Sequence, residues 1–88
     1  MNLHIIQKQT DALSLCLSYT NQGDPLVITS NHLYHLLRDP LSVSERQVFI
    51  LDSDLEASGL KTQLKNYEVI SYKQFIELSL ICNKVVTW

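Results

Sequence analysis

Five short apolar runs, most of them rich in β-branched side chains, alternate with helix-like segments along 88 residues, and this alternation constrains the fold most strongly. The predicted strands span residues 3–6, 26–29, 48–51, 67–70 and 85–88. The predicted helices span residues 10–23, 33–37, 53–58 and 71–83. Strands that alternate with helices connect through right-handed crossovers. The sequence therefore predicts an α/β fold with a small, mostly parallel five-stranded sheet and helices on both faces.

Capping residues mark where these helices begin and end. The expected N-caps are Thr10, Ser30 or Asn31, Ser53 and Ser71. Glu56 and Gln74 lie three residues after the last two caps, which is the capping-box pattern. Gly59 is suited to close the third helix in a left-handed conformation. Ile70 is expected to pack against Phe75 across the start of the last helix.

The composition indicates one domain whose surface is short of charge. With two glycines, two prolines and no low-complexity segment or internal repeat, residues 1–88 are predicted to form a single domain. Charged residues make up 18% of the sequence, against about 25% in typical soluble domains, although the hydrophobic share of 45% is ordinary. Four helices, two of them very short, also give thin cover to five strands. Both observations indicate that part of the apolar surface meets another subunit.

Charge and hydropathy argue against several function classes. The net charge of −2 and the lack of a Lys/Arg cluster disfavour direct nucleic-acid binding. No apolar run approaches the roughly 20 residues that span a bilayer, and the first residues lack the features of a signal peptide, so we expect a cytoplasmic protein without membrane contact. The loop after the first strand has no glycine, which removes the usual support for nucleotide binding, and no cofactor is expected.

The two cysteines are the candidates for covalent sulfur chemistry. A thiolate accepts and passes on sulfur as a persulfide, and this reactivity requires a low pKa. Cys16 falls two turns into the first helix on the stripe of Leu13 and Leu17, which favours a buried structural thiol over a persulfide carrier. Cys82 falls near the end of the last helix, where the helix dipole disfavours the thiolate. Neither cysteine has zinc-type spacing, and both fit a reducing compartment.

Acidic and histidine residues provide two weak candidates for a metal site. Asp52 and Asp54 follow the third strand, but helix capping explains them better, because the first strand ends in Gln7 where a phosphoacceptor site would place acids. His32 and His35 are three residues apart on the second helix and lack a third ligand, so helix-surface histidines are favoured. No metal site is predicted.

Histidine and aromatic residues near the two ends of the sequence are assigned to packing or contact. His4 alternates with Leu3 and Ile5 in the first strand, so a packed or hydrogen-bonded role is favoured over a catalytic one. Trp88, together with Tyr72 and Phe75, fits either the core or a protein interface, and aromatic anchors are common at interfaces. The spacing of serine, histidine and aspartate supports no catalytic triad.

The order of short motifs resembles that of the TusB/DsrH family of sulfur-relay proteins over essentially the whole chain. The motifs that carry the resemblance span residues 3–8, 10–13, 23–24, 51–60, 71–78 and 85–88. The resemblance implies a DsrE-like, Rossmann-like three-layer fold. It also implies a B-type, non-catalytic subunit of a sulfurtransferase complex with TusC-like and TusD-like partners, commonly a heterohexamer built as a dimer of heterotrimers.

The resemblance further implies a route for the sulfur. In the Tus branch the D subunit carries the relay cysteine and contacts the sulfur-carrier proteins, and the sulfur ends in 2-thiouridine at the wobble position of transfer RNA. Some DsrH-type members have a cysteine at the place of Cys16, which leaves a direct persulfide carrier as one alternative. A dissimilatory sulfur-oxidation relay is a second alternative. A homo-oligomeric binding module with a small ligand at the strand ends is a third.

The chain departs from the family pattern at two places. Members usually carry an acidic residue after the second strand, where this chain has Ser30 and Asn31. They also tend to have an arginine before the glycine that follows the third strand, where this chain has Ser58. Both differences remove charge from the edge of the expected site, which fits a non-catalytic subunit better than an enzyme.

Overall fold

The computed structural model describes residues 1–7, 11–29 and 32–88, which form a five-stranded sheet flanked by helices. The strands are β1 (Asn2–Ile6), β2 (Leu26–Ile28), β3 (Val48–Leu51), β4 (Glu68–Ile70) and β5 (Lys84–Thr87). The helices are α1 (Ala12–Tyr19), α2 (Leu33–Arg38), the 3-10 helix η2 (Pro40–Val43), α3 (Asp52–Ser58) and α4 (Tyr72–Ile81). The predicted caps at Thr10 and at Ser30 or Asn31 lie outside the described residues.

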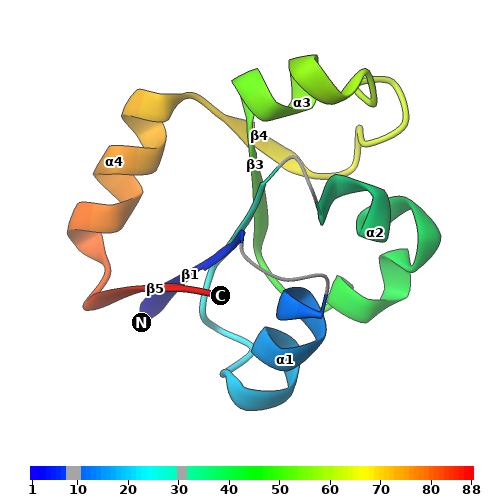
Figure 1. Ribbon diagram of the computed structural model, residues 1–88. Coiled ribbons are helices and arrows are strands. Elements are labelled where there is room, and N and C mark those ends of the chain that lie inside the picture. Colours follow the sequence, from blue (N-terminus) through cyan, green and yellow to red (C-terminus); the bar gives the residue numbers. More distant parts are fainter. Residues whose placement is uncertain (8–10, 30–31) are drawn as a thin grey trace.

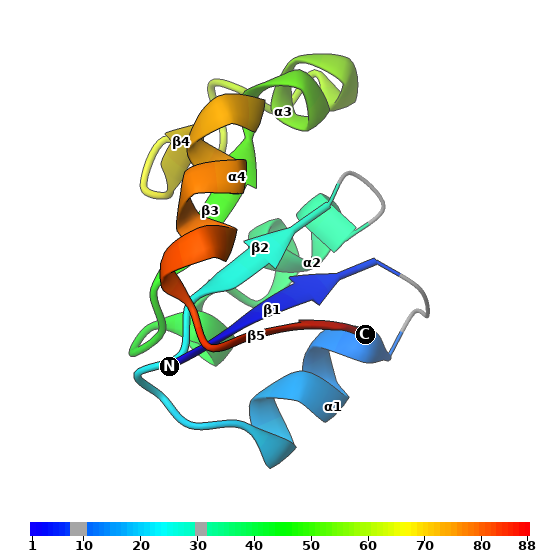
Figure 2. The ribbon, with the colours of Figure 1, turned by 90° about the vertical axis from the view of Figure 1, so that its left-hand side faces the viewer.

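The strands lie in the order β4-β3-β2-β1-β5, and every neighbouring pair is parallel. The chain therefore builds the sheet outward from β1 to β4 and then returns through α4 to place β5 on the opposite side of β1. Figure 2 shows β5 beside β1, with both ends of the chain near this edge. The predicted α/β fold is confirmed, and the sheet is parallel throughout.

Alternating side chains divide the core between the two faces of the sheet. The larger cluster contains the buried strand residues Ile6, Leu26, Ile28, Val48 and Ile50. Buried residues of α1 and α2 belong to the same cluster, as do Val43 of η2, Leu55 of α3, and Leu60 and Leu64 from the segment after α3. The smaller cluster contains Leu3, Val27, Phe49 and Ile70. Figure 1 shows α1 and α2 on one side of the sheet and α4 on the other.

The cover on the two faces is unequal. α1 and α2 bury side chains completely, for example Leu13 and Leu33, whereas no residue of α4 is fully buried. Phe75 and Leu78 of α4 pack against the smaller cluster while remaining partly exposed. The sequence-based expectation of thin helical cover is therefore confirmed for the α4 face.

Both ends of α3 and the start of α4 test the capping predictions. Ser71 caps α4 in a complete capping box with Gln74, and Gly59 ends α3 with a φ of 73°, as predicted. The predicted capping box at Ser53 is wrong, because α3 begins at Asp52 directly after β3 and Leu51 occupies the N-cap without a side-chain bond. Since no connecting residue separates β3 from α3, Ser53 already lies within the first turn.

The first helix is shorter than predicted. α1 ends at Tyr19 rather than near Gly23, because Thr20 is extended, with φ and ψ of −121° and 162°. The Thr20 hydroxyl donates to the carbonyl oxygen of Cys16 at 2.6 Å, which occupies one acceptor of the last turn. This ending leaves residues 21–24 free to form the turn that leads into β2.

The position of Ile50 in the central part of the larger cluster predicts a large loss of stability on truncation. Ile50→Ala is expected to lower the free energy of unfolding by about 2–5 kcal/mol, because the side chain is 0% exposed and leaves a cavity. Ile81→Ala is the matched control, since Ile81 is 72% exposed, and should change stability by less than about 0.5 kcal/mol. Denaturant unfolding of the two variants measures both values, and equal losses would contradict this packing.

Candidate functional site

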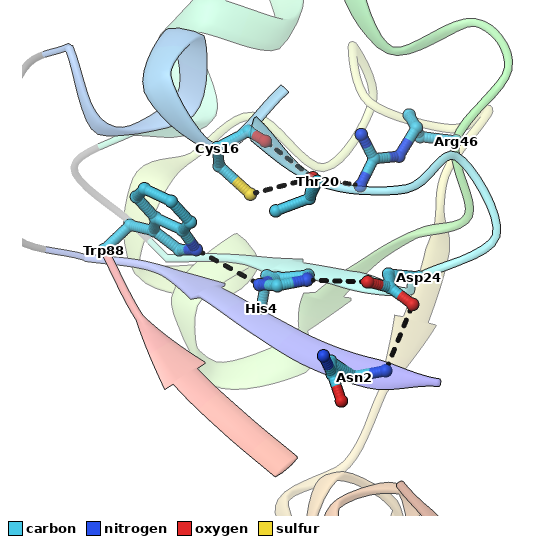
Figure 3. Close-up of polar contacts among 7 residues, drawn as sticks. All are labelled: Asn2, His4, Cys16, Thr20, Asp24, Arg46 and Trp88. Carbon is cyan, nitrogen blue, oxygen red and sulfur yellow. Dashed lines mark hydrogen bonds and ion pairs between the residues drawn. The ribbon is translucent and has the colours of Figure 1, made fainter. Parts of the chain in front are cut away.

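A row of buried polar groups crosses the amino-terminal part of the sheet on the α1 face. His4, in the middle of β1, is 3% exposed, and its Nε2 lies 3.0 Å from Oδ2 of Asp24. The indole Nε1 of Trp88 donates to His4 Nδ1 at 3.1 Å. The backbone N–H of Asn2 donates to Oδ1 of Asp24 at 3.1 Å. Figure 3 shows Trp88, His4, Asp24 and Asn2 joined in this order.

These partners determine which ring nitrogen of neutral His4 carries the proton. An indole N–H is a donor only, so His4 Nδ1 must present a lone pair to Trp88. The proton of neutral His4 therefore lies on Nε2, where it is donated to the Asp24 carboxylate. In this state His4 has a partner at each ring nitrogen, and the sequence-based prediction of a packed, hydrogen-bonded histidine is confirmed.

The Asp24 carboxylate is stabilised in its ionised form. Burial acts to raise its pKa, but the hydrogen bonds from His4 and from the Asn2 backbone, with the positive charges nearby, outweigh burial and lower the pKa below the usual value of 3.8. Asp24 is 6% exposed and lies in the turn between α1 and β2. The histidine and the backbone donor therefore compensate the cost of burying the Asp24 carboxylate.

A second polar group lies beside this row and centres on Thr20. Cys16 Sγ lies 3.8 Å from Thr20 Oγ1, and the Arg46 guanidinium donates to the same oxygen at 2.9 Å. Figure 3 shows the Cys16 thiol pointing from α1 toward the sheet. The Nε of Arg46 is buried and has no hydrogen-bond partner among the described residues.

The environment of Cys16 opposes thiolate formation. Burial raises the pKa of the thiol above its usual range, because the side chain is 0% exposed within the larger cluster. The hydrogen bond to Thr20 and the charge of Arg46 act in the opposite direction without overcoming burial, and Asp24 adds to the increase. In this chain alone, Cys16 is therefore neither accessible nor activated as a nucleophile.

The structure separates the two cysteines. Cys16 belongs to the larger cluster on the α1 face, whereas Cys82 is half-buried and packs against the smaller cluster on the α4 face. Both thiols are free. Because the sheet lies between the clusters, the two cysteines do not form one dithiol site.

The carboxyl ends of the strands, where ligands commonly bind in such sheets, carry the other sequence candidates. Asp52 is exposed, Asp54 is half-buried, and both lie in the first turn of α3. His32 is buried, which lowers its pKa despite an opposing contribution from the backbone of Gln7, and His35 is half-buried. Among the described residues, no three metal-ligating side chains come together.

The three aromatic side chains considered as core or interface residues differ in burial. Trp88 packs against the larger cluster on the α1 face, and Phe75 packs against the smaller cluster on the α4 face. Tyr72 is 68% exposed. Within this chain His4 and the larger cluster hold the indole of Trp88, and a contact role at a protein interface stays a prediction.

Sequence reasoning missed Asp24, Thr20 and Arg46 because it examined only the carboxyl ends of the strands. These residues gather at the opposite end, where the turn after α1 approaches the start of β1. One sequence feature could have indicated the row: a histidine inside an apolar strand needs a buried partner, and Asp24 lies two residues before a buried strand.

Fold and site together define a class of protein: a small parallel α/β domain with an internally hydrogen-bonded polar row and a buried thiol at Cys16. Comparison with protein families then places it more closely, since the family model described as DsrH like protein matches residues 7–85. The chain belongs to the DsrH-like family, which supports involvement in a sulfur relay. No curated protein is similar enough to the chain to count as a match.

Among the described residues, no helix is both long enough and apolar enough to cross a bilayer.

The lowered pKa of Asp24 predicts a pH-dependent contribution to stability. At about pH 6, Asp24→Asn is expected to destabilise the protein by about 1–3 kcal/mol, because it removes an ionised acceptor from two buried donors. A carboxyl whose pKa is lowered by folding stabilises the native state above its unfolded pKa and loses this contribution as the pH falls further. The difference from wild type should therefore shrink below the usual value of 3.8. Denaturant unfolding from about pH 6 to pH 2.5 measures it, and a constant difference would contradict the assignment.

Proposed function

We propose that this chain is a non-catalytic structural subunit of a heteromeric sulfur-relay complex. Its partners are TusC-like and TusD-like subunits in a heterohexamer made of two heterotrimers, and the D-type subunit carries the persulfide and contacts the sulfur-carrier proteins. The complex serves 2-thiouridine formation at the wobble position of transfer RNA in the cytoplasm, and this chain contacts no nucleic acid directly. Membership of the DsrH-like family supports the sulfur-relay part of this proposal.

The buried state of Cys16 is the observation that carries the non-catalytic role. Persulfide exchange proceeds by attack of a thiolate on an accessible sulfur atom, so it needs both a lowered thiol pKa and an open path. Cys16 is 0% exposed, and its pKa is raised. Both properties favour a structural thiol.

The outer surface of α4 supports the subunit role. Tyr72, Ile76 and Leu80 follow one another at intervals of four residues, which places them on one stripe of the helix. Tyr72 and Leu80 are 68% and 78% exposed, and Ile81 beside them is 72% exposed. An apolar stripe of this kind, on the only helix among the described residues that packs against the smaller cluster, is typical of a protein interface.

The sheet edge at β5 adds to this surface. β5 pairs with β1 on one side only, and in the part of the chain that the structure describes no strand pairs with its other side. Val85 of β5 is 47% exposed. Edge strands present unpaired backbone donors and acceptors, which a partner subunit can satisfy.

If α4 forms the subunit interface, a charge on its apolar stripe should break the complex. Leu80→Asp is expected to reduce co-purification with coexpressed TusC-like and TusD-like subunits by at least about tenfold, because the aspartate would be buried at the interface. Leu41→Asp is the matched control, since Leu41 on η2 is 80% exposed, and should leave the complex intact. A stable monomer that ignores both partners would refute the subunit role.

The hydrogen bond between Cys16 and Thr20 and the nearby charge of Arg46 favour a direct persulfide carrier as the second candidate, because both lower the thiol pKa. The two candidates differ in thiol reactivity. In the structural role, Cys16 should be alkylated at least about tenfold more slowly than half-buried Cys82, because it is inaccessible. Peptide mass spectrometry after iodoacetamide measures both rates. Rapid alkylation of Cys16, or an added sulfur on Cys16 after incubation with a persulfide donor, would favour the carrier instead.

The pathway itself is open to a direct test. Deleting the coding sequence should lower 2-thiouridine in bulk transfer RNA if the complex serves wobble modification. Unchanged 2-thiouridine with impaired oxidation of reduced sulfur would place the complex in a dissimilatory relay.

A further inference from the structure

His4 is held between two partners that respond oppositely to a second proton on the ring. The Asp24 carboxylate, 3.0 Å from Nε2, interacts more strongly with an imidazolium than with a neutral imidazole. The Trp88 indole, 3.1 Å from Nδ1, requires a neutral ring because it donates into the Nδ1 lone pair. A proton added at Nδ1 would place two donors face to face and remove this bond.

The surroundings of His4 contain few other charges. Asp24 is the anion in direct contact, and the amino group of Met1 acts on that same carboxylate. From α1, Cys16 contributes a thiol whose raised pKa keeps it neutral, with Arg46 beyond Thr20. The neighbouring strands contribute apolar partners, because His4 is in register with Leu26 of β2 and with Val86 of β5. The ring is therefore governed mainly by Asp24 on one side and by Trp88 on the other.

Trp88 is tied to the domain by two kinds of interaction. Its backbone N–H donates to the carbonyl oxygen of Ile5 at 2.8 Å, and its carbonyl oxygen accepts from the N–H of Gln7 at 2.9 Å. Its side chain depends on His4 for the indole hydrogen bond and on packing against the larger cluster. Losing the indole bond would leave the donor unpaired in a partly buried site, which favours rotation of the ring toward water.

We propose that His4 acts as a proton-sensitive latch for Trp88: neutral His4 holds the indole on the α1 face, and protonated His4 pairs with Asp24 and releases the indole to solvent. The backbone pairing of β5 with β1 does not involve the imidazole, so the strand remains in place while the side chain leaves. The latch does not depend on the sulfur-relay role or on any partner subunit.

Trp88 is the only tryptophan in the sequence, so intrinsic fluorescence reports directly on the latch. On acidification of the full 88-residue chain from about pH 8 to pH 5, we expect the emission to shift to longer wavelength and acrylamide quenching to increase at least about twofold. Acrylamide quenching is measured because a nearby imidazolium can change the fluorescence intensity of Trp88 even when the indole stays in place. His4→Gln should lose this pH dependence. Constant quenching in wild type, or the same pH dependence in folded His4→Gln, would overturn the latch.

A second measurement keeps the test valid if His4→Gln does not fold. NMR titration of the assigned His4 ring gives its midpoint in variants that retain the histidine. Trp88→Phe should raise this midpoint by about half to one pH unit, because the bond that requires the neutral ring is gone. Asp24→Asn should lower it, because the anion that stabilises the imidazolium is gone. An unchanged or lowered midpoint in Trp88→Phe would overturn the proposal.

Discussion

An all-parallel sheet must be covered by apolar side chains on both faces, and the rest of this structure follows from how unevenly that requirement is met. On the α1 face, residues of α1, α2, η2, α3 and the segment after α3 form a cluster with many fully buried side chains. On the other face, α4 packs against a smaller cluster and keeps no residue fully buried. The polar row and Cys16 lie on the well-covered face, whereas the exposed apolar stripe lies on the other.

This asymmetry relates the chemistry of the chain to its surface. Burial on the well-covered face removes water from Cys16, which raises the thiol pKa. The same face encloses His4 and Asp24, which must then hydrogen-bond to each other. The poorly covered face leaves the side chains of Tyr72 and Leu80 mostly exposed. A DsrH-like protein built in this way has the thiol of Cys16 on the better-covered face and the exposed apolar stripe of α4 on the opposite face.

The row from Trp88 through His4 to Asp24 connects distant parts of the sequence. The residue after the last strand is joined to the first strand, and the first strand to the turn before the second. These contacts at the edge strand help to explain how β5, reached only after α4 crosses the sheet, is held beside β1. In that respect the polar row serves the fold in addition to any response to protons.

The sequence by itself predicted the five strands and four α-helices that the structure describes, though not η2, because short β-branched runs and helix caps such as Ser71 are local features read over a few residues. It also indicated that Cys16 is buried, since the helical stripe carries that information. It misjudged Ser53 as a cap, because that outcome depends on where β3 ends and α3 begins. Only the tertiary structure showed that Asp24 hydrogen-bonds to His4, that Arg46 hydrogen-bonds to Thr20, and that α4 has no fully buried residue. Partners 20 or more residues apart leave no periodic trace in a single sequence, so only packing brings them together.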